Sequence, residues 1–351
     1  MSKLDQWKQA AKSWHDPNQI CVETIDAHTA GQPLRIFIDG FPLPEGQNIL
    51  ARRRDAQSRL ESYRTGTMWE PRGHADMYGC IIVPPERETS DFGVLFVHNE
   101  GYSSMCGHGI IAVAKIAVQV GWVESDSNPT NINIDAPAGL IKAQVHFNDD
   151  RQITGVSFCN VESFVDSLDC IVDVHGLGQV KYDLAYGGAY YAFVDADQIQ
   201  LELKPNNQPQ IVDIGRRIKQ AIIKSKEINH PLHDDLSFLY GTIFTGQPRT
   251  RNNHSRHVCV FADGEVDRSP TGTGVSARTA ILAARNQLEP GQKICIESVI
   301  GSTFEVEIAE MTRYGKFEAV IPRVFGNAFV TGRHQFFFDP TDELKKGFFL
   351  R

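Results

Sequence analysis

The sequence predicts an α+β fold with two pseudo-symmetric domains, each a curved β-sheet or barrel around one central helix. A strand-like run, a glycine-rich turn and a long apolar segment occur in that order twice along the chain. Both apolar segments have helical length and are apolar nearly all round, which is typical of a buried helix. Many short stretches of alternating polar and apolar residues surround them and indicate strands.

The two copies of this pattern align residue by residue. Strand, turn and apolar segment fall at 94–97, 105–109 and 110–120 in the first copy and at 258–261, 267–274 and 275–283 in the second. The turns pair Cys106 with Thr271, Gly107 with Gly272, His108 with Thr273 and Gly109 with Gly274. We interpret the copies as the cores of two domains whose helix N-termini face one site.

The rest of the chain is assigned around these cores. We expect 21–160 to form the N-terminal domain and 161–325 the C-terminal domain, with the tail 326–351 packed on the N-terminal one. Residues 1–20 are polar and form an extension with a short amphipathic helix. The spacing of apolar residues in 211–228 predicts an amphipathic surface helix.

Size and composition narrow the class of protein. The chain has 351 residues, of which 41% are hydrophobic and 22% charged, as in ordinary globular proteins. Its net charge of -8 argues against nucleic acid as a partner, because phosphate binding needs a basic face. No apolar stretch approaches the roughly 20 residues of a membrane span, and the N-terminus lacks a signal-peptide core. The cysteines number seven and have no repeated spacing, so a reducing, cytoplasmic location is expected.

The paired turns suit the binding of a small carboxylate. Free backbone N–H groups at a helix N-terminus, together with the helix dipole, favour an anion. Glycines let a ligand approach the backbone closely. Cys106 stands at such a terminus, where the dipole is expected to lower the pKa of the thiol. It is a candidate general base for a proton α to the carboxylate; the alternative is a structural cysteine.

Two stretches rich in histidine raise the question of a metal. His254, His257 and Cys259 lie close together in the sequence, and 230–235 contains two histidines and two aspartates. Neither stretch has a second ligand pair at zinc-site spacing. The glycines at 272–274 form only part of a nucleotide-binding pattern. We therefore expect no metal and no cofactor.

Taken together, the motifs resemble those of the proline racemase family. Besides the two turns, blocks in the family's order occur at 26–33, 72–77, 186–188, 301–304 and 332. The resemblance covers about residues 21–351 and implies the diaminopimelate epimerase-like fold of that family. It also implies a small imino acid as substrate, no nucleic acid or membrane as partner, and a homodimer as the assembly to test.

One position departs from the racemases of the family. They carry a second cysteine where this chain has Thr271, and the two thiols act on opposite faces of Cα. A threonine hydroxyl needs an adjacent base to exchange a proton near pH 7, and the local sequence offers none. The Cys–Thr pair resembles the trans-3-hydroxy-L-proline dehydratases of the family, which implies cofactor-independent loss of water to give Δ1-pyrroline-2-carboxylate. The alternatives are a proline or hydroxyproline racemase or 2-epimerase, and a non-catalytic imino-acid binding protein.

The resemblance also implies a role for each site residue. Cys106 is implied as the catalytic base. The substrate-binding residues are implied to be Gly107, His108, Asp267, Thr271, Gly272 and Thr273. Backbone amides of this set would hold the carboxylate, while the side chains of His108 and Asp267 would contact the ring nitrogen. Thr271 would form a small polar wall on the opposite face, or serve only as a helix N-cap. Asp267 has the alternative role of capping the turn before Pro270.

Overall fold

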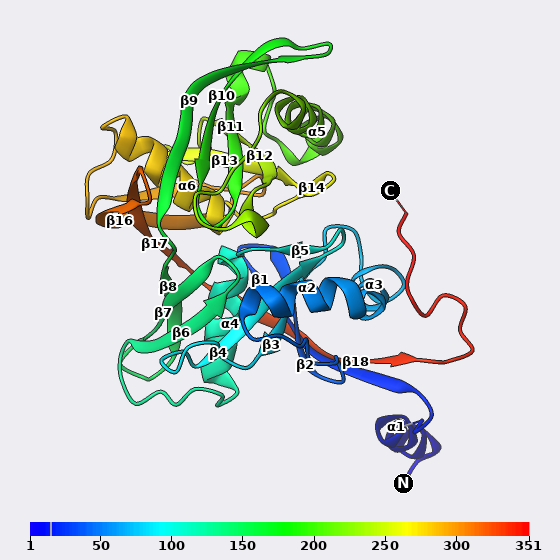
Figure 1. The fold of residues 1–351 in the computed structure, drawn as a ribbon. Helices are drawn as coiled ribbons and strands as arrows, with labels where there is room; N and C mark the ends of the chain where they lie inside the picture. Colours follow the sequence, from blue (N-terminus) through cyan, green and yellow to red (C-terminus); the bar gives the residue numbers. More distant parts are fainter. Residues whose placement is uncertain (15, 351) are drawn as a thin grey trace.

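The computed structural model describes residues 1–14 and 16–350 and has the predicted α+β architecture (Figure 1). Two bodies lie one above the other, and each is a curved sheet around one helix. The central helices are α4 (Gly107–Gln119) and α6 (Gly272–Ala284). α4 is buried from its start to Ala117, and α6 is buried from its start to Leu282 except at Arg278. Both predicted buried helices are therefore confirmed.

In the first body, antiparallel hairpins alternate with parallel strand pairs. The strands are β1 (Ile20–Thr29), β2 (Gln32–Asp39), β3 (Tyr78–Val83), β4 (Phe92–His98), β5 (Tyr102–Ser103), β6 (Thr130–Ala136), β7 (Gly139–Phe147) and β8 (Ile153–Cys159). β1–β2, β3–β4, β4–β5, β6–β7 and β7–β8 are antiparallel pairs. β2–β3 and β4–β6 are parallel pairs, in which the later strand returns in the same direction.

The second body repeats this order of pairings. Its strands are β10 (Gly178–Tyr186), β11 (Tyr190–Asp195), β12 (Leu239–Gly246), β13 (Ser255–Phe261), β14 (Glu265–Val266), β15 (Lys293–Glu297), β16 (Thr303–Tyr314) and β17 (Phe317–Gly326). The parallel steps are β11–β12 and β13–β15, which correspond to β2–β3 and β4–β6. The antiparallel pairs also correspond one to one. The pseudo-symmetry inferred from the two turns therefore extends through the sheets.

Two strand crossings join the bodies. β9 (Ser163–Val174) follows β8 and pairs with β10, and β18 (Ala328–Phe338) follows β17 and pairs with β1. β17 pairs with β8 near its end and with β9 nearer its start. The last strand therefore lies beside the first, on the lower body in Figure 1. The domain limits near 160 and 325 stay a prediction.

Outer helices complete both bodies. α2 (Ile49–Arg59) and α3 (Glu61–Met68) lie on the first body, and α5 (Gln208–Ser225) packs on β9, β12 and β13 of the second. α5 buries Ile214, Ile218 and Ile222, as the apolar spacing predicted. Short 3-10 helices occur at η1 (Ala196–Ile199), η2 (Pro205–Asn207) and η3 (Asp234–Leu236). Among the described residues, no helix is both long and apolar enough to cross a membrane.

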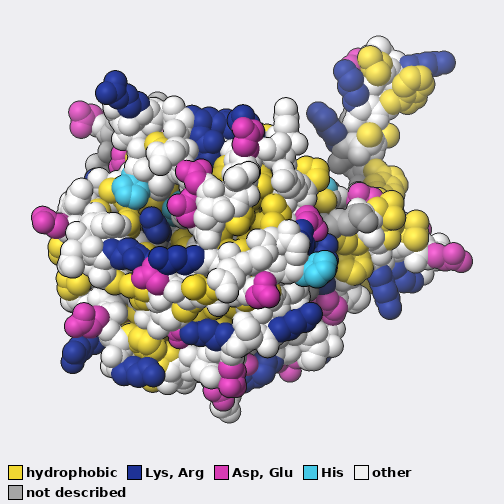
Figure 2. Space-filling model, turned by 90° about the horizontal axis from the view of Figure 1, so that it is seen from above, with side chains coloured by type: hydrophobic (Ala, Val, Ile, Leu, Met, Phe, Trp, Pro, Cys, Tyr) yellow, Lys and Arg dark blue, Asp and Glu magenta, His cyan; other side chains and the backbone are white. Residues whose placement is uncertain are grey.

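The N-terminal helix α1 (Lys3–Ser13) stands away from both bodies (Figures 1 and 2). A capping box between Ser2 and Asp5 closes its first turn, because each side chain accepts a backbone N–H of the other residue. None of its residues is buried, and Trp7 is 66% exposed. Local hydrogen bonds thus stabilise this helix, and packing against the first body adds little to its stability.

We predict that deletion of residues 1–13 leaves the free energy of unfolding within about 0.5 kcal/mol of the full chain, because no buried contact is lost. Urea unfolding followed by tryptophan fluorescence and circular dichroism measures it. As a control, Ile218→Ala removes a fully buried side chain and should cost about 2–5 kcal/mol. A loss above about 1 kcal/mol on deletion would show that α1 packs on the body in solution.

Candidate active site

The starts of α4 and α6 touch each other, backbone against backbone. A Cβ atom built on Gly107 would lie 2.5 Å from the Cα of Gly272, and one built on Gly272 would lie 2.5 Å from the Cα of Gly107. Only glycine permits this approach, since any side chain would force the helices apart. The two predicted helix N-termini therefore do meet at one place, between the bodies.

A small cavity of about 20 Å³ lies at this junction. Its wall contains every residue that the sequence predicted for the site, and it also contains Met105 and four aromatic residues. The predicted residues are Cys106, Gly107, His108, Asp267, Thr271, Gly272 and Thr273, and the aromatic residues are Tyr78, Tyr191, Tyr240 and Phe261. The sequence analysis missed the aromatic wall, because these residues come from four separate strands and belong to no local motif.

Backbone amides at both helix starts are suited to a carboxylate. Gly107, His108, Gly272 and Thr273 occupy the first turns of α4 and α6, where N–H groups have no acceptor within their own helix. Both helix dipoles direct their positive ends at the same cavity. The arrangement can bind one carboxylate from two sides, although its use for substrate stays a prediction.

Cys106 caps α4, but the prediction of a lowered thiol pKa is wrong for the closed site. Its Sγ accepts the N–H of Gly109 at 3.3 Å. Burial nevertheless raises the pKa of the Cys106 thiol well above its usual value, and the negative charge of Asp267 adds to the rise. The Gly109 bond, which is the second-largest influence, and the nearby Tyr78 side chain lower the pKa, but burial outweighs both. Desolvation thus outweighs the helix terminus.

His108 lies against this thiol, a contact that the sequence did not reveal. Its Nδ1 is 3.1 Å from Sγ of Cys106. Burial lowers the pKa of His108, so the imidazole is neutral near pH 7. The charge of Asp267 and the backbone of Pro33 act in the opposite direction and are weaker influences than burial. A neutral imidazole keeps one ring nitrogen as an acceptor, which suits it to receive the thiol proton.

Asp267 combines a structural bond with a place in the cavity wall. Its Oδ1 accepts the N–H of Ser269 at 2.7 Å, so the turn-capping role proposed as an alternative does occur. The residue is 4% exposed and forms part of the cavity wall. A buried carboxylate at this place favours a cationic group on the ligand.

Thr271 begins α6, but its side chain does not cap the helix. The residue is held at φ +70°, a conformation that is rare for a β-branched side chain, whereas its counterpart Cys106 is extended at φ −146°. The buried hydroxyl of Thr271 has no hydrogen-bond partner among the described residues, and the buried thiol of Cys259 is a neighbour. Burial raises the pKa of the Cys259 thiol well above its usual value, so this neighbour is not a base near pH 7.

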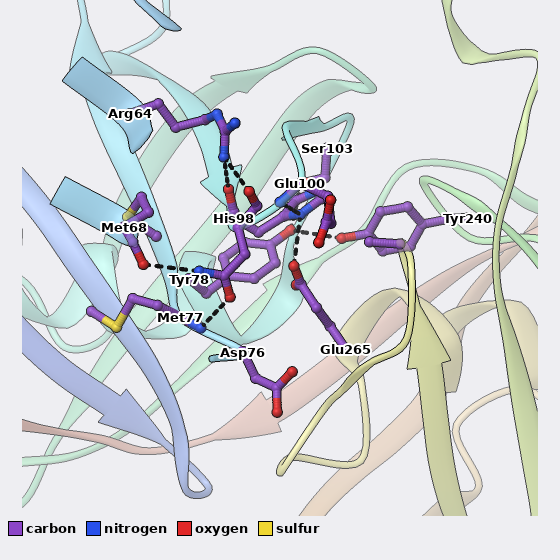
Figure 3. A network of polar contacts seen from close by, with 12 residues as sticks. Arg64, Met68, Asp76, Met77, Tyr78, His98, Glu100, Ser103, Tyr240 and Glu265 are labelled. Carbon is purple, nitrogen blue, oxygen red and sulfur yellow. Dashed lines mark hydrogen bonds and ion pairs between the residues drawn. The ribbon is translucent and has the colours of Figure 1, made fainter. Parts of the chain in front are cut away.

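A polar network connects the two bodies behind the cavity (Figure 3). The hydroxyl of Tyr78 lies 2.5 Å from Oγ of Ser103 and 3.2 Å from the hydroxyl of Tyr240, which reaches in from the second body. Nδ1 of His98 lies 3.4 Å from Oε1 of Glu265, again across the junction. These contacts align the aromatic wall only when the bodies are together.

The histidines considered for a metal lie elsewhere. Both ring nitrogens of His257 are buried without a hydrogen-bond partner among the described residues, and Nδ1 of His254 lies 3.0 Å from Oγ of Ser255. Within residues 1–14 and 16–350, no group of three or more His, Cys, Asp or Glu side chains is arranged to hold a metal ion.

Comparisons with known proteins identify the family. A sequence model described as proline racemase matches residues 24–349. A trans-3-hydroxy-L-proline dehydratase of Colwellia psychrerythraea is 46% identical over 349 residues, covering 99% of this chain and 97% of the relative. The Homo sapiens protein of the same name is 42% identical, covering 96% of this chain and 97% of the relative. The chain belongs to the proline racemase family.

A solved structure shares the whole fold. It is a hydroxyproline epimerase from Agrobacterium vitis with bound trans-4-hydroxy-L-proline, with a TM-score of 0.90 and 28% identity. The match covers 95% of this chain and 96% of that structure. The fold predicted from the resemblance is therefore confirmed.

We predict that Gly107→Ala lowers the free energy of unfolding by about 1–3 kcal/mol, because its Cβ would overlap the start of α6. Urea unfolding measures the change. Gly155→Ala is the matched control, since a Cβ there meets a single atom, the carbonyl oxygen of Gly326, at 3.1 Å. Equal stabilities of the two variants would contradict the close contact between the helix starts.

Proposed function

We propose that this member of the proline racemase family is a cofactor-independent hydro-lyase that converts trans-3-hydroxy-L-proline to Δ1-pyrroline-2-carboxylate. The observation that carries the proposal is the asymmetry of the two helix starts. Cys106 offers one thiol to the cavity, and the corresponding Thr271 has no base beside it. Relatives 42–46% identical over almost the whole chain carry the name of this dehydratase.

The reaction needs a base on only one face of the ring. In trans-3-hydroxy-L-proline the hydroxyl is trans to the carboxylate and so shares a face with the hydrogen on Cα. The amides of both helix starts hold the carboxylate and stabilise the enediolate that develops there. The Cys106 thiolate removes the α-proton, and hydroxide then leaves C3 from the same face. The enamine formed tautomerises to the cyclic imine.

The positive charge of the substrate favours the Cys106 thiolate, which the buried site disfavours. The pKa of the Cys106 thiol is high partly because Asp267 is negative. A ring ammonium bound next to Asp267 offsets that charge and favours the thiolate. His108 is placed to take the thiol proton. A cavity of about 20 Å³ has room for little more than one water, so the bodies must separate to admit the ring.

Two further assignments accompany the proposal. We place the protein in the cytoplasm, since all of its cysteines are free thiols. A homodimer is the assembly we would test by light scattering.

The direct test is incubation of the purified protein with trans-3-hydroxy-L-proline, 4-hydroxy-L-proline and L-proline in D2O, followed by NMR. The dehydratase converts the first to the cyclic imine and leaves the configuration of the others unchanged. Inversion at Cα of the others would instead support a racemase or epimerase, the activity in the name of the A. vitis structure. Binding without any reaction would support an imino-acid binding protein.

We predict that Cys106→Ser lowers the dehydration rate by roughly 10²–10⁴-fold, because a serine hydroxyl is a far weaker acid than a thiol and supplies no base near pH 7. Calorimetry should show that the substrate still binds. Cys295→Ser, at a half-buried thiol outside the cavity, is the matched control and should keep full activity. Unchanged activity of the Cys106 variant would remove this residue as the base.

We predict that Thr271→Cys introduces exchange at Cα from the second face, since a thiol replaces the hydroxyl opposite Cys106. In D2O the variant should produce deuterated D-proline from L-proline. Thr271→Ser adds no thiol and should not do so. Absence of deuterated D-proline from the cysteine variant would contradict the opposed placement of the two positions.

A further inference from the structure

We propose that Tyr78 is a second catalytic residue, whose phenol protonates the hydroxide as it leaves C3. The inference rests on the dehydration proposed above and concerns the step that the base alone leaves open. A hydroxide is a poor leaving group, so its departure requires a proton donor on the same ring face as Cys106.

Tyr78 is the hydroxyl group placed beside the base. The residue begins β3, is 3% exposed and lines the cavity. It shares the cavity wall with Cys106, and its ring neighbour His108 has Nδ1 3.1 Å from Sγ of Cys106. Its ring packs edge-on against His108, with ring centroids 4.9 Å apart. A group that leaves from the face attacked by Cys106 therefore departs towards this phenol.

The other hydroxyls near the cavity are less well placed. The hydroxyl of Tyr191 lies 2.7 Å from Oγ1 of Thr273, at the start of the opposite helix. The hydroxyl of Tyr240 lies 3.2 Å from the Tyr78 hydroxyl, and no hydrogen bond joins it to Cys106 among the described residues. Ser103 is not part of the cavity wall, and its Oγ lies 2.5 Å from the Tyr78 hydroxyl. Ser103 and Tyr240 are thus positioning residues that fix the phenol of Tyr78.

The proton balance closes without an external acid. Cys106 breaks the Cα–H bond and becomes a thiol. The electron pair on Cα forms the Cα–Cβ double bond as the C3–O bond breaks. Tyr78 gives its proton to the departing hydroxide, which becomes water, and the phenolate takes the proton of the Cys106 thiol. The proton taken from Cα thus replaces the one that Tyr78 gave to water, and both groups return to their starting states.

Burial keeps the phenol ready for this role. It raises the pKa of Tyr78 well above its usual value, so the group remains protonated at neutral pH. Hydroxide is a stronger base than a phenolate, so proton transfer from Tyr78 to the departing hydroxide is favourable. Because Tyr240 belongs to the second body, the donor is aligned only when the site is closed around substrate.

The experiment uses a leaving group that needs no proton. Wild type and Tyr78→Phe are compared on trans-3-hydroxy-L-proline and on 3-chloro-L-proline of the same relative configuration. We expect the variant to slow the loss of water by about 10²–10⁴-fold and the loss of chloride by less than about tenfold. It should also exchange the α-proton of unreacted trans-3-hydroxy-L-proline with D2O. Tyr102→Phe, which removes a buried hydroxyl bonded to the Ala56 carbonyl outside the cavity, is the matched control.

Three results would overturn the inference. Dehydration by Tyr78→Phe within a few-fold of wild type would mean that Cys106 protonates the hydroxide itself. Equal slowing of both substrates, or loss of exchange in step with elimination, would mean that the phenol acts on the thiol. A wild type that does not dehydrate the hydroxy substrate would instead refute the proposed function. If the variant does not fold, the solvent isotope effect is measured on the wild type with both substrates. An effect on the loss of water but not on the loss of chloride supports a proton donor. Equal effects on the two reactions exclude it.

Discussion

The contact between Gly107 and Gly272 is the constraint on which the rest of the structure depends. A Cβ added to either glycine would lie only 2.5 Å from the opposing backbone, so the two helices meet at their first turns without room for a side chain. Each sheet therefore wraps its helix in a way that leaves the N-terminus at the surface of its body. The residue that begins each helix then lies at the edge of one shared cavity, so a single glycine pair sets both the arrangement of the bodies and the place of the chemistry.

The scaffold is symmetric, whereas the residues it presents are not. Cys106 is extended and turns its sulfur back onto the amide of Gly109. Thr271 adopts φ +70°, and its buried hydroxyl has no hydrogen-bond partner among the described residues. The two positions thus differ in backbone conformation as well as in side chain. Of the two facing positions, one carries a thiol and the other a hydroxyl, and this asymmetry is what the proposed elimination rests on.

Local patterns predicted the parts of the structure that depend on contiguous residues. Hydrophobic periodicity and motif spacing are properties of the sequence itself. They located the two helices, their glycine turns and the site residues from Cys106 to Thr273. The aromatic wall could not be located in this way, since Tyr78, Tyr191 and Tyr240 begin or occupy strands far apart in sequence. The pKa of Cys106 was predicted in the wrong direction for the same reason: the helix terminus is local, but burial depends on both bodies closing.

Burial determines the protonation states of the side chains that line the cavity. It raises the pKa of the Cys106 thiol and of Tyr78, and it lowers the pKa of His108, so all three groups favour their neutral forms. A base must then be created by charge that arrives with the ligand. A zwitterionic imino acid brings a carboxylate for the helix starts and an ammonium for Asp267, and in a dry site both interactions are strong. A ring without the ammonium would leave the charge of Asp267 uncompensated and the thiol protonated, and a ring without the carboxylate would lose its hold on the helix starts. In the proposed reaction, selection of an α-imino acid therefore follows from desolvation as much as from the contacts that hold it.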